Sequence, residues 1–162
     1  MELVADANVL IDYAKTDPTI LALYTRHLGP IYVPNVILDE VDQLDISDCE
    51  SLGLTVVEEP LQILLAASEK RGPLSFEDRV CLMLAQANQW VCVTNEKPLH
   101  RACKQEKMAS IWGLRLMIEL ARAEQLKSDS AIEVAQAIHR INPRYITLVI
   151  LARFKAELPG FE

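Results

Sequence analysis

Four acidic residues have positions from which they could form a metal site. Asp6 and Glu96 each follow a short apolar segment that predicts a buried strand, and Asp78 lies in the first turn of a predicted helix. Glu40 lies in the predicted helix after the second strand. Ligands of an open parallel sheet bind beyond the carboxyl ends of its strands. We therefore expect these four side chains to converge at one edge of one sheet.

Carboxylates held close together repel one another, so such a cluster needs a cation. Oxygen-only ligands suit the hard cations Mg²⁺ or Mn²⁺, and the scattered His27, His100 and His139 do not favour zinc. Acid clusters of this type hydrolyse phosphodiester bonds with one or two bound ions. The sequence has no glycine-rich phosphate loop and no setting for a serine or cysteine nucleophile. Nucleotide-dependent and acyl-transfer reactions are therefore disfavoured.

Each acid also has an ordinary structural explanation. Asp6 could be only the N-cap of the helix that it precedes. Ser75 and Asp78 have the spacing of a capping box, and Glu96 could be an acid favoured by a helix dipole. Glu40 falls within an apolar helical stripe, where a carboxylate needs a partner or a cation; the stripe is formed by Val36, Ile37, Val41 and Leu44. The functional interpretation depends on the convergence of all four.

The elements that must position these acids alternate along the chain. Apolar, partly β-branched segments predict strands at residues 2–5, 31–33, 54–57, 90–94 and 109–112. Caps and periodicity predict helices at 8–15, 17–27, 35–44, 61–71, 75–88, 97–107 and 114–125, with one more turn within 45–52. Strands that alternate with helices predict an α/β fold, a three-layer α/β/α sandwich with a central parallel sheet. We assign residues 1–127 to this catalytic domain.

Residues 128–162 are predicted to be a C-terminal helical extension packed on the same domain. A helix is expected over 128–139, and Asn142 and Pro143 have the types of an N-cap and first residue for a last helix to about 157. Residues 145–151 are apolar almost all round, which favours a buried helix. An edge strand or a partner-binding surface are the alternatives.

Charge and composition limit the location and the partners. The net charge is −7, but residues 1–94 hold 15 acidic and 5 basic residues, against 8 and 11 in residues 95–162. No apolar run is long enough to span a membrane, and the start of the chain does not resemble a signal peptide. We expect a cytoplasmic protein with no membrane association, in which Cys49, Cys81, Cys92 and Cys103 are reduced core thiols.

A basic helix face adjoins the predicted acid cluster. Its residues are spaced by three or four and could contact backbone phosphates of RNA: Lys97, Arg101, Lys104 and Lys107. An ordinary solvated face is the alternative, and it is the favoured one. His100 is expected at the surface, and Trp90 and Trp112 are expected in the core.

Four segments in this order resemble the successive motifs of PIN-domain ribonucleases of the toxin type (VapC-like). They are VADANVL at residues 4–10, VPNVILDEV at 33–41, LSFED at 74–78 and VTNEKPL at 93–99. Their order and spacing match over about residues 1–125. The resemblance implies a compact α/β/α sandwich and cleavage of RNA that depends on Mg²⁺ or Mn²⁺. It further implies a homodimer and an antitoxin protein as a partner.

The resemblance also implies roles for individual residues. Asp6, Glu40 and Asp78 would be metal ligands, and Asn8 and Thr94 would orient ligands and waters by hydrogen bonds. The family usually has Asp where this chain has Glu96, so the negative charge is kept on a longer side chain. Glu96 completes the expected set of catalytic, metal-binding acids, and Asn95 is a further polar candidate at the same strand end.

Two other functions compete with a ribonuclease. The glutamate at position 96 and the apolar tail are compatible with a PIN-like module that binds RNA or protein with weakened or lost catalysis. A small phosphatase or receiver-like domain would use Asp6 as phosphoryl acceptor. That function is disfavoured because Asp6-Ala7-Asn8 lacks the second aspartate of a phosphatase loop.

Overall fold

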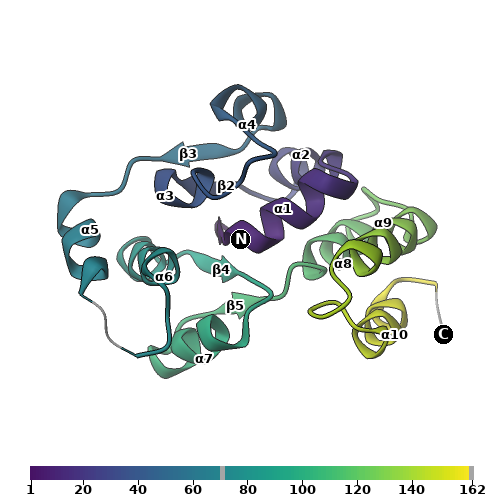
Figure 1. Ribbon diagram of the computed structural model, residues 1–162. Coiled ribbons are helices and arrows are strands. Elements are labelled where there is room, and N and C mark those ends of the chain that lie inside the picture. The colour runs from purple at the N-terminus through teal and green to yellow at the C-terminus, as the bar shows by residue number, and fades with distance from the viewer. Residues whose placement is uncertain (70–71, 161–162) are drawn as a thin grey trace.

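The structure, a computed structural model, describes residues 1–69 and 72–160. Its centre is a five-stranded, entirely parallel sheet with strand order β3-β2-β1-β4-β5 (Figure 1). The strands are β1 Leu3–Ala5, β2 Ile31–Pro34, β3 Thr55–Val57, β4 Val91–Val93 and β5 Ser110–Ile111. The predicted parallel sheet is confirmed; β2 is one residue longer than expected, and the other four strands are shorter.

Helices connect the strands and cover both faces of the sheet. The described residues form α1 Ala7–Thr16, α2 Thr19–His27, α3 Asn35–Leu38, α4 Ile46–Leu52, α5 Leu61–Ser68, α6 Phe76–Asn88, α7 Lys97–Gln105, α8 Arg115–Arg122, α9 Ser128–Ile141 and α10 Leu148–Glu157. α5, α6 and α7 pack in one layer, and α1, α2, α4, α8 and α9 pack in the other. The predicted three-layer α/β/α sandwich is therefore confirmed.

The central strand β1 delivers the first acid to the edge of the sheet. Leu3, Val4 and Ala5 are almost fully buried, as expected for a strand covered on both faces. The N–H group of Asp6 donates a hydrogen bond to the carbonyl of Val93 (3.0 Å), which ends β4. The carboxyl ends of β1 and β4 are thus level, and the residues that follow them lie side by side.

The prediction of a helix over residues 35–44 is correct only for its first turn. α3 ends at Leu38, and Glu40 lies in a turn in which its N–H group bonds the carbonyl of Ile37 (3.0 Å). Aspartates at positions 39, 42 and 45 favour turns and caps over helix interiors. Val41 and Leu44 are still buried, but Glu40 is exposed. Its expected place on a buried helical stripe is therefore corrected.

The predicted start of the last helix is also wrong. α9 runs on to Ile141, and α10 begins only after Thr147, whose Oγ1 accepts a hydrogen bond from the N–H group of Ile150 (3.3 Å). Asn142 is the C-cap of α9 and not an N-cap. Its amide instead donates to Asp12 Oδ1 (3.2 Å), a partner 130 residues away that no local pattern could reveal.

The apolar tail is buried on one side only. Ile146, Leu151 and Phe154 are buried, whereas Tyr145, Leu148 and Val149 are 50%, 71% and 61% exposed. The expectation of a helix buried all round is corrected, because α10 packs against α8 and α9 and leaves Leu148 and Val149 at its start in solvent. α9 in turn packs against α1, so residues of the tail contribute to the same core as the sheet.

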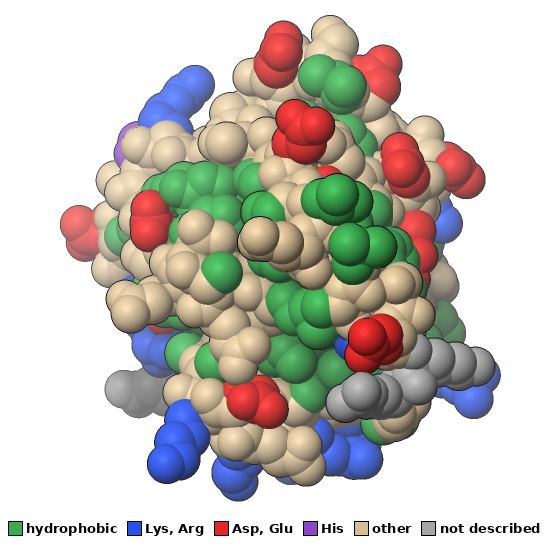
Figure 2. All heavy atoms as spheres, turned by 90° about the vertical axis from the view of Figure 1, so that its left-hand side faces the viewer, with side chains coloured by type: hydrophobic (Ala, Val, Ile, Leu, Met, Phe, Trp, Pro, Cys, Tyr) green, Lys and Arg blue, Asp and Glu red, His purple; other side chains and the backbone are tan. Residues whose placement is uncertain are grey.

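Apolar and basic side chains are both visible on the face in Figure 2. α5 exposes Leu61 and Leu65, and apolar side chains extend across the middle of this face.

The helix predicted over 61–71 ends at Ser68, and its last two positions, 70 and 71, lie outside the described residues. The four cysteines are buried and free. Among the described residues, no helix has the length and apolar character needed to cross a membrane.

Candidate metal centre

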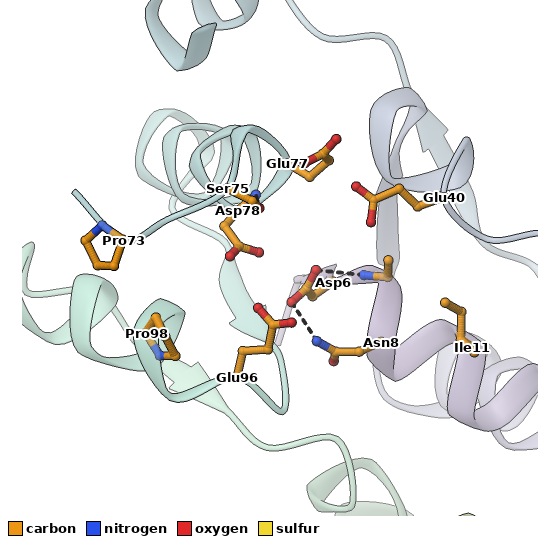
Figure 3. A pocket seen from close by; sticks show the side chains of 11 residues that line it. Asp6, Asn8, Ile11, Glu40, Pro73, Ser75, Glu77, Asp78, Glu96 and Pro98 are labelled. Atoms are coloured by element: carbon orange, nitrogen blue, oxygen red, sulfur yellow. Dashed lines mark hydrogen bonds between the residues drawn. The ribbon is translucent and has the colours of Figure 1, made fainter. Parts of the chain in front are cut away.

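Three of the four predicted acids meet at the carboxyl edge of the sheet. Asp6, Asp78 and Glu96 each offer a carboxylate oxygen, and these oxygens lie within 4.8 Å of one another. Figure 3 shows the three carboxylates pointing toward a common centre from β1, α6 and the segment before α7. They line a pocket of about 430 Å³ whose described lining contains five carboxylates and no lysine or arginine.

The local structure explains how each of the three acids reaches the centre. Asp6 precedes α1 as its N-cap, and its Oδ1 accepts a hydrogen bond from the N–H group of Ala7 (2.8 Å). Ser75 caps α6 by accepting from the N–H group of Asp78 (3.1 Å), while the Asp78 side chain lines the pocket. Glu96 precedes α7 but makes no side-chain capping bond. Capping of α1 therefore explains part of the role of Asp6. It does not explain the position of the Glu96 carboxylate.

Two predicted neighbours hold the Asp6 carboxylate in place. Asn8 Nδ2 donates to Asp6 Oδ2 (3.0 Å), and Thr94 Oγ1 donates to the same oxygen (2.7 Å). Thr94 is fully buried at the end of β4, so its hydroxyl cannot turn to bulk water. These bonds hold the Asp6 carboxylate so that it faces those of Asp78 and Glu96. Figure 3 shows the bond from Asn8.

Asn95 points away from the pocket, into the interior. Its Nδ2 donates to Asp12 Oδ2 (3.1 Å), and its Oδ1 accepts from the N–H group of Gly113 (2.9 Å). Its own N–H group donates to Asn8 Oδ1 (3.2 Å), which orients the Asn8 amide that holds Asp6. Asn95 therefore supports the site from behind and does not line it.

Sequence reasoning missed Asp12, which anchors this interior network. Asp12 is buried on α1 and accepts hydrogen bonds from Asn95 and Asn142. Burial raises its pKa to about 6, against the lowering effect of both amides. A usable signal was present, since Asp12 is an acid on the α1 face that buries Val9 and Tyr13. The network connects the end of α9 to the cluster formed by Asp6, Asp78 and Glu96.

Glu40 lines the same pocket but is not one of the three clustered acids. Figure 3 shows its carboxylate across from that of Glu77, a residue that sequence reasoning did not select. Desolvation, a hydrogen bond with Glu77 and the negative charges of Glu77, Asp6 and Glu96 raise the pKa of Glu40 to about 7. Glu40 therefore lies on the rim of the pocket, where the charges of Asp6 and Glu96 act on its carboxyl group.

The donor set fits a hard divalent cation. Burial and the charges of Asp6 and Glu96 raise the pKa of Asp78 to about 7, and burial raises that of Asp6. A cation would remove this repulsion, because it interacts favourably with every ionised carboxylate at once. Three oxygen donors from three separate elements, without a cysteine or histidine among them, match the preference of Mg²⁺ or Mn²⁺.

The metal-free protein is expected to lose stability as the pH rises from about 4 to 7. Asp78, with a folded pKa of about 7 against 3.8 unfolded, binds its proton more tightly when folded, so its deprotonation favours unfolding. Glu40 and Asp12 act in the same direction. We expect a melting temperature roughly 5 °C lower at pH 8 than at pH 5.5, and its recovery with Mg²⁺. A pH-independent melting temperature would contradict this.

Two aromatic residues near β5, His100 and Trp112, differ from expectation. His100 is half-buried and not a surface residue: Nδ1 bonds Ser110 Oγ (2.7 Å) and Nε2 bonds the carbonyl of Thr94 (2.8 Å). Trp112 is 45% exposed and not in the core. Trp90 is partly buried and packs against the core, in line with expectation, and it stacks on Tyr32 with ring centroids 3.9 Å apart. Three basic residues that could contact RNA phosphates are exposed on α7, as a solvated face would also require: Lys97, Arg101 and Lys104.

Comparison with known proteins identifies the fold. No family model matches the sequence, and no curated protein matches it. A solved structure that is similar to this chain is a PilT N-terminus domain protein from the hyperthermophilic archaeon Sulfolobus solfataricus P2. The similarity has a TM-score of 0.52 at 14% sequence identity, and it covers 78% of this chain and 95% of that one. This similarity shows a PIN-like fold.

Proposed function

We propose that this protein is a ribonuclease that depends on Mg²⁺ or Mn²⁺ and hydrolyses RNA phosphodiester bonds. One observation carries the proposal: Asp6, Asp78 and Glu96 bring carboxylate oxygens within 4.8 Å of one another at the carboxyl edge of a PIN-like sheet. PIN-like domains are often metal-dependent nucleases, and the motif order over residues 1–125 resembles the ribonucleases of that class.

The three clustered carboxylates would hold the ion. When bound, Mg²⁺ or Mn²⁺ supplies Lewis-acid activation of the phosphodiester and of the attacking water. Asn8 and Thr94 keep Asp6 in position through their hydrogen bonds. Glu40 lies in the same pocket, across from Glu77, and would act on the substrate side of the ion.

The cellular role is a further part of this proposal. The resemblance to toxin-type ribonucleases supports a toxin that forms a homodimer and binds an antitoxin protein in the cytoplasm. The exposed apolar residues Leu61 and Leu65 on α5 offer a surface for such contacts. A small DNA-binding protein encoded by the neighbouring reading frame would support the toxin role, and a neighbour of unrelated type would count against it.

Cleavage of RNA by purified protein tests the activity. Unstructured and structured RNAs are incubated with the protein in Mg²⁺, in Mn²⁺ and in EDTA, beside an Asp6→Asn variant prepared identically. We expect cleavage by the wild type in metal only. Equal cleavage by both proteins would identify a contaminating nuclease and refute the proposal.

A PIN-like binding module without catalysis is the second candidate. Tyr145, Leu148 and Val149 favour it, because exposed apolar side chains close together often mark a protein contact. Calorimetric titration with Mn²⁺ separates the two functions. Binding that is lost in Asp78→Asn supports a working metal centre, whereas no binding to the wild type supports the module.

A further inference from the structure

Trp112 is an exposed aromatic residue that is held in a fixed position. It directly follows β5, is 45% exposed, and packs against the His100 ring in a tilted arrangement, with ring centroids 3.8 Å apart and an angle of 31° between the rings. Both ring nitrogens of His100 are hydrogen-bonded, to Ser110 and to the carbonyl of Thr94. The imidazole is therefore immobilised and supports one face of the indole, while much of the indole remains in contact with solvent.

This aromatic pair is directly connected to the metal centre. β5 pairs with β4 so that Ile111 lies opposite Val93, which places Trp112 beside Thr94 at the carboxyl edge. Thr94, whose carbonyl binds His100, also donates its hydroxyl to Asp6 (2.7 Å). Trp112 does not line the acidic pocket, so it lies next to the centre and not in it.

The helix that carries His100 also exposes basic side chains. His100 belongs to α7, which packs against β5 and exposes Lys97, Arg101 and Lys104. The first turn of α7 also reaches the acidic pocket, where Pro98 forms part of the wall (Figure 3). Lysine and arginine side chains gather at the lower end of the face in Figure 2, the end at which Figure 1 places α7. In a chain of net charge −7, this arrangement complements a polyanion.

We propose that Trp112 stacks on an unpaired base of single-stranded RNA, while Lys97 and Arg101 contact the phosphates that lead into the acidic pocket. This inference rests on the proposed ribonuclease function and names how its substrate is held. An exposed indole beside cationic side chains is the usual platform for unpaired bases, since every base has a face that can stack. A base inside a duplex has no free face, so the platform selects unpaired RNA.

His100 is the positioning residue of this platform. An indole that is already held on one face loses little conformational freedom when a base covers the other. Removing the imidazole would release Trp112 without removing its stacking surface. His100→Ala is therefore expected to weaken RNA binding less than Trp112→Ala.

RNA binding in a cleavage-silenced protein tests the platform. In the full-length Asp78→Asn variant, the dissociation constant for a labelled 12-nucleotide single-stranded RNA is measured by fluorescence anisotropy with Mg²⁺ present. We expect Trp112→Ala to raise it about 5- to 100-fold and Trp112→Phe to restore most of the affinity. Trp90→Phe, at the other tryptophan, is the matched control and should leave the affinity unchanged. Binding of a duplex of the same length should not depend on Trp112.

Two further measurements make the result specific to stacking. With Trp90→Phe also present, Trp112 is the only tryptophan, and its fluorescence should be quenched as RNA is added. Arg101→Ala should reduce the slope of log affinity against log salt by about 1. Equal RNA affinities of Trp112→Ala and its parent, no measurable RNA binding, or unquenched fluorescence would each overturn the inference.

The outcomes separate this inference from the function on which it rests. A wild-type protein that cleaves RNA, with an affinity that does not depend on Trp112, refutes the platform alone. A protein that binds RNA through Trp112 but never cleaves it refutes the ribonuclease alone. If Trp112→Ala instead abolishes capture of a protein partner and leaves RNA affinity unchanged, the surface is a protein-binding site and the proposal fails.

Discussion

Asp78→Asn is expected to abolish RNA cleavage and to make the metal-free protein more stable. The substitution removes one of three clustered carboxylates, so Mn²⁺ affinity should fall by about 100-fold or more and cleavage below detection. The same change removes a carboxyl group whose pKa is raised to about 7 by burial and by the negative charges of Asp6 and Glu96. We expect a gain of about 1–2 kcal/mol in the free energy of unfolding at pH 8 without metal.

The opposite signs of these two effects distinguish a functional site from a structural one. If Asp78 served only to stabilise its helix, replacing it would lower the stability of the protein. Asp129→Asn is the matched control, because Asp129 is an exposed first-turn acid on α9, outside the described lining of the pocket. It should leave metal binding and cleavage unchanged and cost about 0.5 kcal/mol through the helix dipole. Thermal melting, calorimetry with Mn²⁺ and RNA cleavage together provide the measurement.

Destabilisation of the metal-free protein by Asp78→Asn, with metal binding retained, would show that Asp78 is a helix-capping acid. Such a result would remove the main support for the metal centre. It would leave the PIN-like fold unaffected, because the fold rests on the sheet topology and on structural similarity.

Glu96→Asp is expected to reduce cleavage by about 10-fold or more, although the family motif usually has Asp at this position. The Glu96 carboxylate already lies with those of Asp6 and Asp78. Its backbone is held by a hydrogen bond from its N–H group to Thr94 Oγ1 (3.1 Å), so the main chain cannot simply advance. Shortening the side chain would withdraw the carboxylate by more than 1 Å, and active sites tolerate little misplacement.

Glu96→Gln separates charge from length at this position. It keeps the length and removes the charge, so it should weaken Mn²⁺ binding at least as much as Glu96→Asp does. Calorimetry and single-turnover cleavage on both variants measure the two effects. Full activity in both variants would show that Glu96 is idle and that the site works with Asp6, Asp78 and Glu40.

The sequence was sufficient for the three clustered acids because each has a local signal. Asp6 follows a buried strand, Ser75 marks the helix start that places Asp78 in the pocket, and Glu96 follows another buried strand. Parallel strands bring their carboxyl ends to one edge, so local signals were enough to infer a distant convergence. Asn8 and Thr94 have the same advantage, because they are adjacent in sequence to those strand ends.

Glu40 was misplaced because helix length is a weak local signal. An apolar periodicity continued to Leu44, but aspartates in that segment favour turns, and the helix ended at Leu38. Val41 and Leu44 were nevertheless buried by tertiary packing. The same pattern of buried residues can thus arise from a helix or from successive turns, and only the folded chain distinguishes them.

What the sequence determined by itself was the alternation of strands and helices, the parallel sheet and the acids at the ends of β1 and β4. These follow from interactions within a few residues and from the rule that parallel strands share an edge. Only the tertiary structure decided which side chains pair across the chain. The contact of Asn142 with Asp12 spans 130 residues, and the support of Trp112 by His100 depends on the packing of α7 against β5. Such contacts depend on how separate elements pack, which residue types and spacing do not encode locally.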